Sequence, residues 1–241
     1  MRTRVLMVAF LTLPAPRAAL SQVSIELGPV FYLAQRLVAQ PRVEAPEGSQ
    51  ASALTESGTW LGAEGRIRYG SFSLSGGVVQ GDLRNRQLNS QVDTDLRVSR
   101  ASLLFHPTTW LAFGGDADVW RSIRADLGYA AERLVRRIGA GIEISGTLGV
   151  PGLRSVLNGA FYPGGSAKQG FADLTMPDKI DPAELNYRAS VMMEYTSPRL
   201  PLYVRVGYRA ERFATQLVVD DNNINDQIFG LTVSAGMAIG R

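Results

Sequence analysis

The sequence predicts an all-β protein, a closed antiparallel transmembrane barrel of ten strands, with eight strands as the alternative. Three observations predict it. Apolar and polar residues alternate with a period of two along most of the chain, short turns and long polar connections alternate, and a secretory signal comes first. The 241 residues are 45% hydrophobic, and the chain has no cysteine, which excludes a disulfide scaffold, a cysteine-ligated metal and a thiol enzyme.

Residues 1–21 show the features of a secretory signal peptide in the expected order. A basic start at 1–4 precedes an apolar run at 5–13, prolines end that run, and small residues occupy positions 19 and 21. Cleavage removes three arginines from the 25 basic residues and no acid, so the mature chain carries 22 charges of each sign. This balance argues against nucleic acid as a partner. We therefore predict a signal peptide at 1–21 and a barrel domain at 22–241.

The alternation predicts ten strands in the barrel domain. In the last strand Leu231, Val233 and Met237 share one face, whereas Thr232 and Ser234 share the other. Strands at 22–33 and 95–106 are the weaker ones, and without them the count would fall toward eight. The predicted strands cover 22–33, 57–69, 71–81, 95–106, 109–120, 133–148, 154–163, 185–196, 201–213 and 226–240.

The connections between these strands fall into two classes. Tight turns rich in Gly and Pro lie at 69–71, 106–109, 149–153 and 197–201. Long polar segments lie at 34–56, 82–94, 121–132, 164–184 and 214–225. A membrane barrel has short periplasmic turns at one rim and long extracellular loops at the other, and its first and last strands must pair because unpaired backbone is costly in lipid.

The positions of the aromatic residues favour a barrel whose apolar face points outward. Rings beside the short turns would form a belt in the headgroup zone, at Tyr69, Phe72, Phe105, Trp110, Tyr195 and Tyr203. A second belt would lie at the opposite strand ends, at Tyr32, Trp60, Trp120, Tyr162, Tyr187, Phe213 and Phe229. The alternative is that aromatic residues simply favour strands and the corners of a core.

The polar face of the strands carries many charges, which an outward apolar face would direct into the lumen. Five arginines and four acids nearly cancel there, so we expect ion pairs that fill a narrow bore rather than a wide pore. The predicted lumen charge network consists of Glu64, Arg66, Arg68, Asp116, Glu143, Arg188, Glu194, Arg205 and Arg209.

With these features the chain resembles the small outer-membrane β-barrel proteins of Gram-negative-type bacteria over residues 22–241. The most specific part is the last strand, where Ser234, Gly236 and Ile239 match the terminal signal of such proteins, although Arg241 stands where an aromatic residue is usual. The resemblance implies residence in the outer membrane after signal cleavage. It also implies contact with outer-membrane lipid and assembly by the barrel-assembly machinery.

Few residues offer chemistry. The single histidine, His106, lies in a predicted turn without an evident acid or nucleophile, so we interpret it as a turn residue. The resemblance to ten-stranded outer-membrane proteases implies acids and a histidine at the extracellular rim, and this rim has no histidine. Asp116 and Asp118 share an inward face and suit either an acid–base pair or, more simply, ion pairs with lumenal arginines.

The oxygen-rich segment 220–226 lacks the glycine and distal glutamate of a calcium-binding EF-hand loop, so it reads as a solvated surface loop. We predict no catalytic residue, metal or cofactor. The favoured function is a non-enzymatic outer-membrane barrel, structural or interacting through its loops, whose partner the sequence does not identify. Alternatives are a narrow channel for small solutes or ions, a hydrolase using Asp116 and Asp118, and a soluble ligand-holding barrel.

Overall fold

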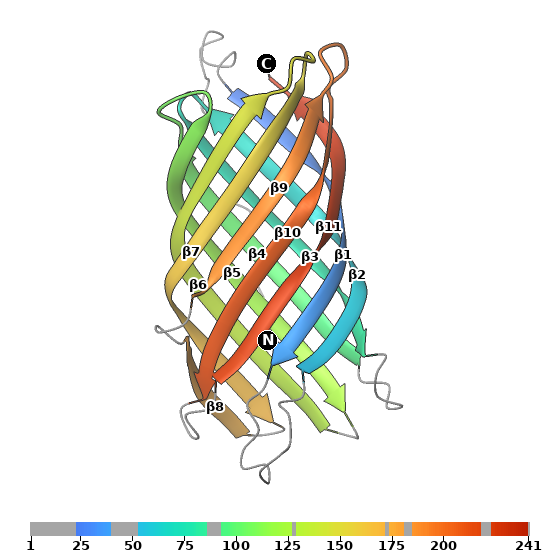
Figure 1. Ribbon diagram of the computed structural model, residues 1–241, viewed down its shortest axis with the longest axis vertical. Coiled ribbons are helices and arrows are strands. Elements are labelled where there is room, and N and C mark those ends of the chain that lie inside the picture. Colours follow the sequence, from blue (N-terminus) through green and yellow to red (C-terminus); the bar gives the residue numbers. More distant parts are fainter. Residues whose placement is uncertain are drawn as a thin grey trace, which may run out of the picture.

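The chain forms a closed antiparallel β-barrel in the computed structural model, which describes residues 23–39, 53–85, 93–126, 129–171, 174–180, 185–217 and 223–240 (Figure 1). Eleven strands in these residues fill ten positions, because β8 and β9 share the place between β7 and β10. The predicted fold class is therefore confirmed. The strands are β1 (Val23–Ala39), β2 (Ala53–Tyr69), β3 (Phe72–Asn85), β4 (Asp93–Phe105), β5 (Leu111–Asp126), β6 (Tyr129–Thr147), β7 (Leu153–Phe171), β8 (Leu174–Ile180), β9 (Tyr187–Thr196), β10 (Leu202–Leu217) and β11 (Asn223–Ile239).

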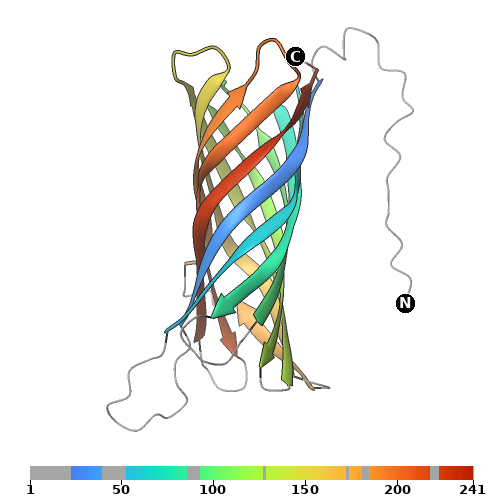
Figure 2. The same ribbon diagram turned by 90° about the vertical axis from the view of Figure 1, so that its right-hand side faces the viewer.

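Pairing between β1 and β11 closes the sheet. The two strands lie side by side along the barrel (Figure 2), with a register that runs from Ile25 opposite Ile239 to Ala39 opposite Asn225. Their backbones approach so closely that a Cβ on Gly236 would overlap the carbonyl oxygen of Leu27. Closure leaves no sheet edge, which is the condition for a β-structure to persist in hydrocarbon.

The four tight turns gather at one end of the barrel, which we call the turn end. They lie at 70–71, 106–110, 148–152 and 197–201, near the beginning of β1 and the end of β11 (Figure 1). Gly149 and Gly152 adopt φ of 76° and 82°, a backbone conformation that favours glycine. The opposite end is the loop end.

The strands reach further toward the loop end than the sequence predicts. β1 continues to Ala39 and β2 begins at Ala53, so the expected connection 34–56 is partly strand, and 164–184 contains the end of β7 and all of β8. The prediction is wrong there because polar residues such as Arg36 and Glu56 were expected in solvent, whereas they face inward and pair with each other.

The apolar face of the strands points outward, as predicted. Leu231, Val204 and Ile142 are exposed by 42%, 43% and 45%, whereas Arg205 and Glu143 are buried. A soluble barrel would place the apolar face inside, so the orientation argues against that alternative. The described residues contain no helix that is long and apolar enough to cross a membrane.

One bulge interrupts the regular pairing of β6 with β7. Ala140 pairs with Phe161 and Ile138 pairs with Gly164, so β7 has one residue more than β6 across this step. A Cβ on Gly139 would overlap the Phe161 carbonyl oxygen, so the bulge depends on glycine here. Pro163 lies within it, where no ladder hydrogen bond is lost.

We expect Gly236→Val to weaken closure, since the added side chain must separate β11 from β1 at the backbone. The cost should be at least about 1–3 kcal/mol, the range for an overpacked site. The matched control is Ala235→Val, whose side chain faces outward on the same strand. Urea unfolding and resistance to SDS without heating measure the effect, and equal stability of the two variants would contradict it.

Candidate functional site in the barrel lumen

The lumen is filled by layers of side chains, and the first layer, at the loop end, is charged. Arg36 Nη1 lies 3.1 Å from Glu56 Oε2, and its Nη2 lies 2.8 Å from Asp226 Oδ1. Arg133 pairs with the other oxygen of Asp226, while the Thr94 hydroxyl donates to Glu56. These residues come from β1, β2, β4, β6 and β11, so the layer ties distant strands together. We call it the loop-end layer.

An aromatic plug lies next to the loop-end layer, on the side toward the turn end. It consists of Tyr32, Trp60, Trp120 and Phe213. Ring centroids are 5.0 Å apart for Tyr32 and Trp60, 6.2 Å for Trp60 and Trp120, and 5.2 Å for Trp120 and Phe213. Each of these side chains is almost completely buried. Aliphatic residues complete the plug, namely Val30, Val79, Leu83, Leu96, Val98, Val135 and Ile228.

Arginines lie against the plug on both sides. The Arg133 guanidinium carbon lies 5.6 Å from the Phe213 ring centroid, on the side of the loop-end layer. Those of Arg100 and Arg137 lie 5.4 Å and 5.6 Å from the Trp120 ring. Cation–π attraction is strongest when desolvated, about 2 kcal/mol per contact, so the arginines and the aromatic rings stabilise each other here.

A central charged layer follows on the turn-end side of the plug. Arg137 donates from Nε to Asp118 Oδ1 at 2.8 Å and lies 3.5 Å from Glu211, which also pairs with Arg100. The Tyr162 hydroxyl donates to Asp116 at 2.6 Å. Asp116 also accepts hydrogen bonds from Ser102 and from Arg188. The two aspartates singled out in the sequence are thus both held by arginine.

A turn-end layer completes the series and is organised around Arg205. This guanidinium lies 2.7 Å from Glu194 and 3.2 Å from Glu64, and it also pairs with Glu26. Arg66 lies 3.1 Å from Glu143, and Arg154 lies 3.1 Å from Glu194. The layer therefore joins strands on opposite sides of the bore.

The nine charges predicted for the lumen do not all behave alike. Seven of them make ion pairs, namely Glu64, Arg66, Asp116, Glu143, Arg188, Glu194 and Arg205. For Arg68 and Arg209, no carboxylate among the described residues lies within ion-pair distance. The sequence reasoning missed further members of the layers, although Glu211 lies two residues from the predicted Arg209 and therefore on the same face of its strand. The missed members are Glu26, Arg36, Glu56, Arg100, Arg133, Arg137, Arg154, Glu211 and Asp226.

The aromatic expectations need a larger correction. Five of the six rings predicted beside the turns are exposed on the outer wall, at Tyr69, Phe72, Phe105, Trp110 and Tyr195. Tyr203 is not, because it is 1% exposed and its ring lies inside, 4.5 Å from the Arg205 guanidinium carbon. The predicted second belt is wrong for its buried members, which fill the lumen instead: Tyr32, Trp60, Trp120, Tyr162 and Phe213.

His106 and the acidic segment near 220 have different surroundings. His106 follows β4 at the turn end, and its Nε2 lies 2.8 Å from the Ser73 hydroxyl, with no carboxylate among its described hydrogen-bond partners. Burial lowers the pKa of His106, and the charge of Arg68 lowers it further.

Asp220 and Asp221 lie outside the described residues. Asp226 is fully buried and paired, so a solvated loop is the wrong description for that residue. The described residues contain no cluster of acids and histidine suited to a metal ion.

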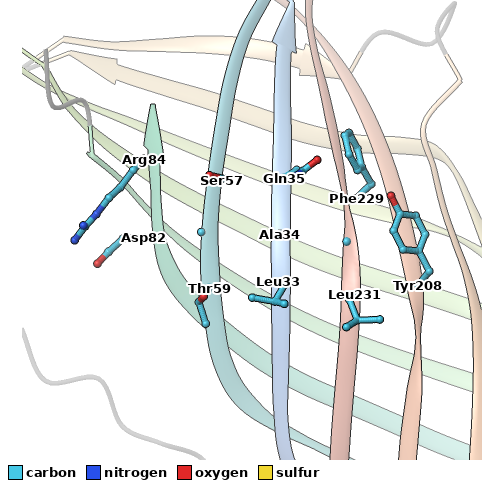
Figure 3. Close-up of a pocket in the computed structure, with 12 residues that line it drawn as sticks. Leu33, Ala34, Gln35, Ser57, Thr59, Asp82, Arg84, Tyr208, Phe229 and Leu231 are labelled. Atoms are coloured by element: carbon cyan, nitrogen blue, oxygen red, sulfur yellow. The ribbon is translucent and has the colours of Figure 1, made fainter. Parts of the chain in front are cut away.

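One hollow of the barrel lies on its outer wall, outside the lumen. It has a volume of about 700 Å³ and is formed by β1, β2, β3, β10 and β11 (Figure 3). Leu33, Leu231 and Tyr208 line one part, and Asp82 and Arg84 line another, so the hollow lies where apolar residues give way to polar ones along the strands.

Comparison with known proteins supports the fold. No protein-family model matches the sequence, and no curated protein matches it. Among solved structures, the outer membrane protease OmpT from Escherichia coli has a TM-score of 0.55 at 8% identity, over 90% of this chain and 96% of that chain. The attachment invasion locus protein Ail of Yersinia pestis gives 0.34 at 12% identity, over 89% and 98% of the two chains. The Pseudomonas putida toluene transporter TodX gives 0.33 at 11%, over 92% and 91%. The fold is that of a ten-stranded outer-membrane β-barrel protein.

Removal of one buried charge should show how much the central layer contributes to the free energy of unfolding. Asp118→Asn leaves the buried Arg137 with the longer contact to Glu211 as its remaining ion pair, so we expect a loss of about 3–5 kcal/mol. The control is Glu132→Gln, which breaks the half-exposed pair with Arg121 and should cost less than about 1 kcal/mol. Urea unfolding followed by tryptophan fluorescence compares the two variants, and similar midpoints would show that the central layer is solvated.

The single histidine gives a pH test. Because burial lowers the pKa of His106 in the folded state, the unfolded chain binds this proton more readily below about pH 6.5. The contribution of His106 to stability is therefore complete above that pH and is lost as the pH falls toward the folded-state pKa. An NMR titration should give one imidazole midpoint below 6.5, and His106→Gln should flatten the pH dependence. A midpoint above 6.5 would contradict the prediction.

Proposed function

We propose that the protein is an integral outer-membrane barrel whose lumen is closed to solutes, and whose role is structural or consists of interactions made at its loop end. The aromatic plug carries this proposal. A narrow barrel has an interior that side chains can fill, and here four packed rings and their aliphatic neighbours occupy the cross-section between two charged layers. Among the residues that the structure describes, such packing leaves no continuous polar path for a hydrated ion.

The outer wall supports a location in the membrane. Large apolar side chains on every side of the barrel are more than a third exposed, among them Leu27, Leu61, Leu103, Ile138 and Val191. A soluble protein rarely exposes so extensive an apolar surface. We propose outer-membrane lipid as its surroundings, with the outer-wall hollow at the boundary between acyl chains and headgroups. Export by the 1–21 signal peptide and insertion by the barrel-assembly machinery belong to the same proposal.

A non-enzymatic role is the simpler interpretation of the lumen. OmpT is a protease, but at 8% identity the likeness concerns the fold alone. Asp116 and Asp118 are occupied by arginines, and the only histidine of the chain lies at the turn end, bonded to Ser73. A general base needs a reactive group within hydrogen-bond reach, and the described residues place no acid in hydrogen-bond contact with His106 that would orient its imidazole beside Ser73.

Planar bilayer recording tests the closed lumen. We expect no stable conductance steps from the wild-type protein, and measurable conductance from the double variant Trp60→Ala and Trp120→Ala, which removes the centre of the plug. Phe113→Ala is the matched control, since it truncates an aromatic ring on the lipid-facing wall. Steady wild-type steps that change when Arg205 is neutralised would instead establish the narrow channel.

A further inference from the structure

A cavity lies in the lumen between the central and the turn-end layers, on the far side of the aromatic plug from the loop end. Its volume is about 120 Å³. Five arginines line it, Arg66, Arg100, Arg188, Arg205 and Arg209, against three carboxylates, those of Glu64, Asp116 and Glu143. The residues that line the cavity therefore carry more positive than negative charge. Three acids outside the lining offset part of it, because Glu211 pairs with Arg100, and Glu26 and Glu194 pair with Arg205.

The carboxylates of the wall are already engaged. Asp116 accepts hydrogen bonds from Ser102, Tyr162 and Arg188. Glu64 accepts from Arg205 and from the Ser234 hydroxyl at 2.6 Å, and Glu143 accepts from Arg66. None of these three acids pairs with Arg209, the fifth arginine of the wall.

Three arginines of the wall keep buried N–H groups for which the described residues provide no acceptor. These groups are Nε of Arg209, Nη1 of Arg188 and Nε of Arg100. Arg100 and Arg188 each have one acidic partner, whereas no carboxylate of the described residues lies within ion-pair distance of Arg209, whose guanidinium carbon lies 5.9 Å from the Tyr32 ring. Arg209 as a whole is half-buried, but its Nε is buried, and a buried N–H of a charged group without an acceptor is unfavourable. An acceptor that brings negative charge would therefore stabilise the site.

We propose that this cavity binds one small oxyanion, of the size and charge of phosphate or sulfate. Arginine presents forked N–H donors that match the oxygens of such an anion. The volume equals that of about four water molecules at ~30 Å³ each, enough for a tetrahedral oxyanion and too little for a nucleotide or a sugar. Arg100, Arg188 and Arg209 come from β4, β9 and β10, so only the closed barrel brings them together.

The anion enters from the turn end. The aromatic plug blocks the other direction, whereas a second hollow of about 270 Å³ occupies the mouth at the turn end and is lined by Glu26, Arg154 and Glu194 of the turn-end layer. In the proposed orientation this mouth faces the periplasm. The binding site is independent of whether the plug also excludes ions, because its donors lie on the turn-end side.

Anion-dependent stability tests the proposal on the full chain in detergent, in buffer free of phosphate and sulfate. We expect phosphate to raise the unfolding temperature saturably at constant ionic strength, with citrate, which is too large for the cavity, and chloride giving no saturable effect. Arg209→Gln should abolish the phosphate response. Arg121→Gln, which removes an outward-facing arginine, should retain it in full.

A second variant, Arg188→Lys, tests the site independently in case Arg209→Gln does not fold. Arg188→Lys keeps the positive charge but removes the free Nη1 donor, and calorimetry should show phosphate affinity reduced by about tenfold or more. Absence of a saturable response in the wild-type protein, or the same response in Arg209→Gln, would overturn the proposal and assign the cavity to water. Conductance recordings answer a different question, so failure of the closed lumen and failure of the anion site are distinguishable.

Discussion

Hydrogen bonding between the first strand and the last is the constraint on which the rest of the molecule depends. Residues 23–39 and 223–239 are far apart in the chain, yet they must pair in one register because lipid offers no partner to an exposed strand edge. Once that register is set, the period of two fixes which side chains face lipid and which face the bore. The contents of the lumen are a consequence of closure.

A narrow bore containing many charges must compensate them internally, and the layers show two ways of doing so. Acids and arginines pair across the lumen, as Arg205 does with three glutamates from separate strands. Aromatic faces provide the second way, because Trp120 and Phe213 lie between guanidinium groups that approach from both sides. The arginines that form the three charged layers thus each lie next to a carboxylate or a ring.

The sequence predicts the faces of the strands better than their ends or the identity of the plug. Alternation around Leu231 and Val204 predicts which residues share a face because it depends on local geometry alone. The ends of β1 and β2 escape prediction because Arg36 and Glu56 look like loop residues until the closed barrel brings Asp226 beside them. Trp120 shares its face with Asp116 and Asp118, so strict parity would have placed it inside, and the preference of aromatic residues for membrane interfaces pointed the wrong way.

The bulge between β6 and β7 has a consequence for how this chain tolerates change in length. Tyr162 and Ala167 both face inward although they are five residues apart, since the surplus residue beside Gly139 offsets the count by one. Deletion of Pro163 would give a strand of uninterrupted alternation with the same residues toward the bore. Deletion of one residue elsewhere in β7 would turn the remainder of the strand inside out. Homologous chains should therefore vary in length at this step and keep the rest of the strand constant.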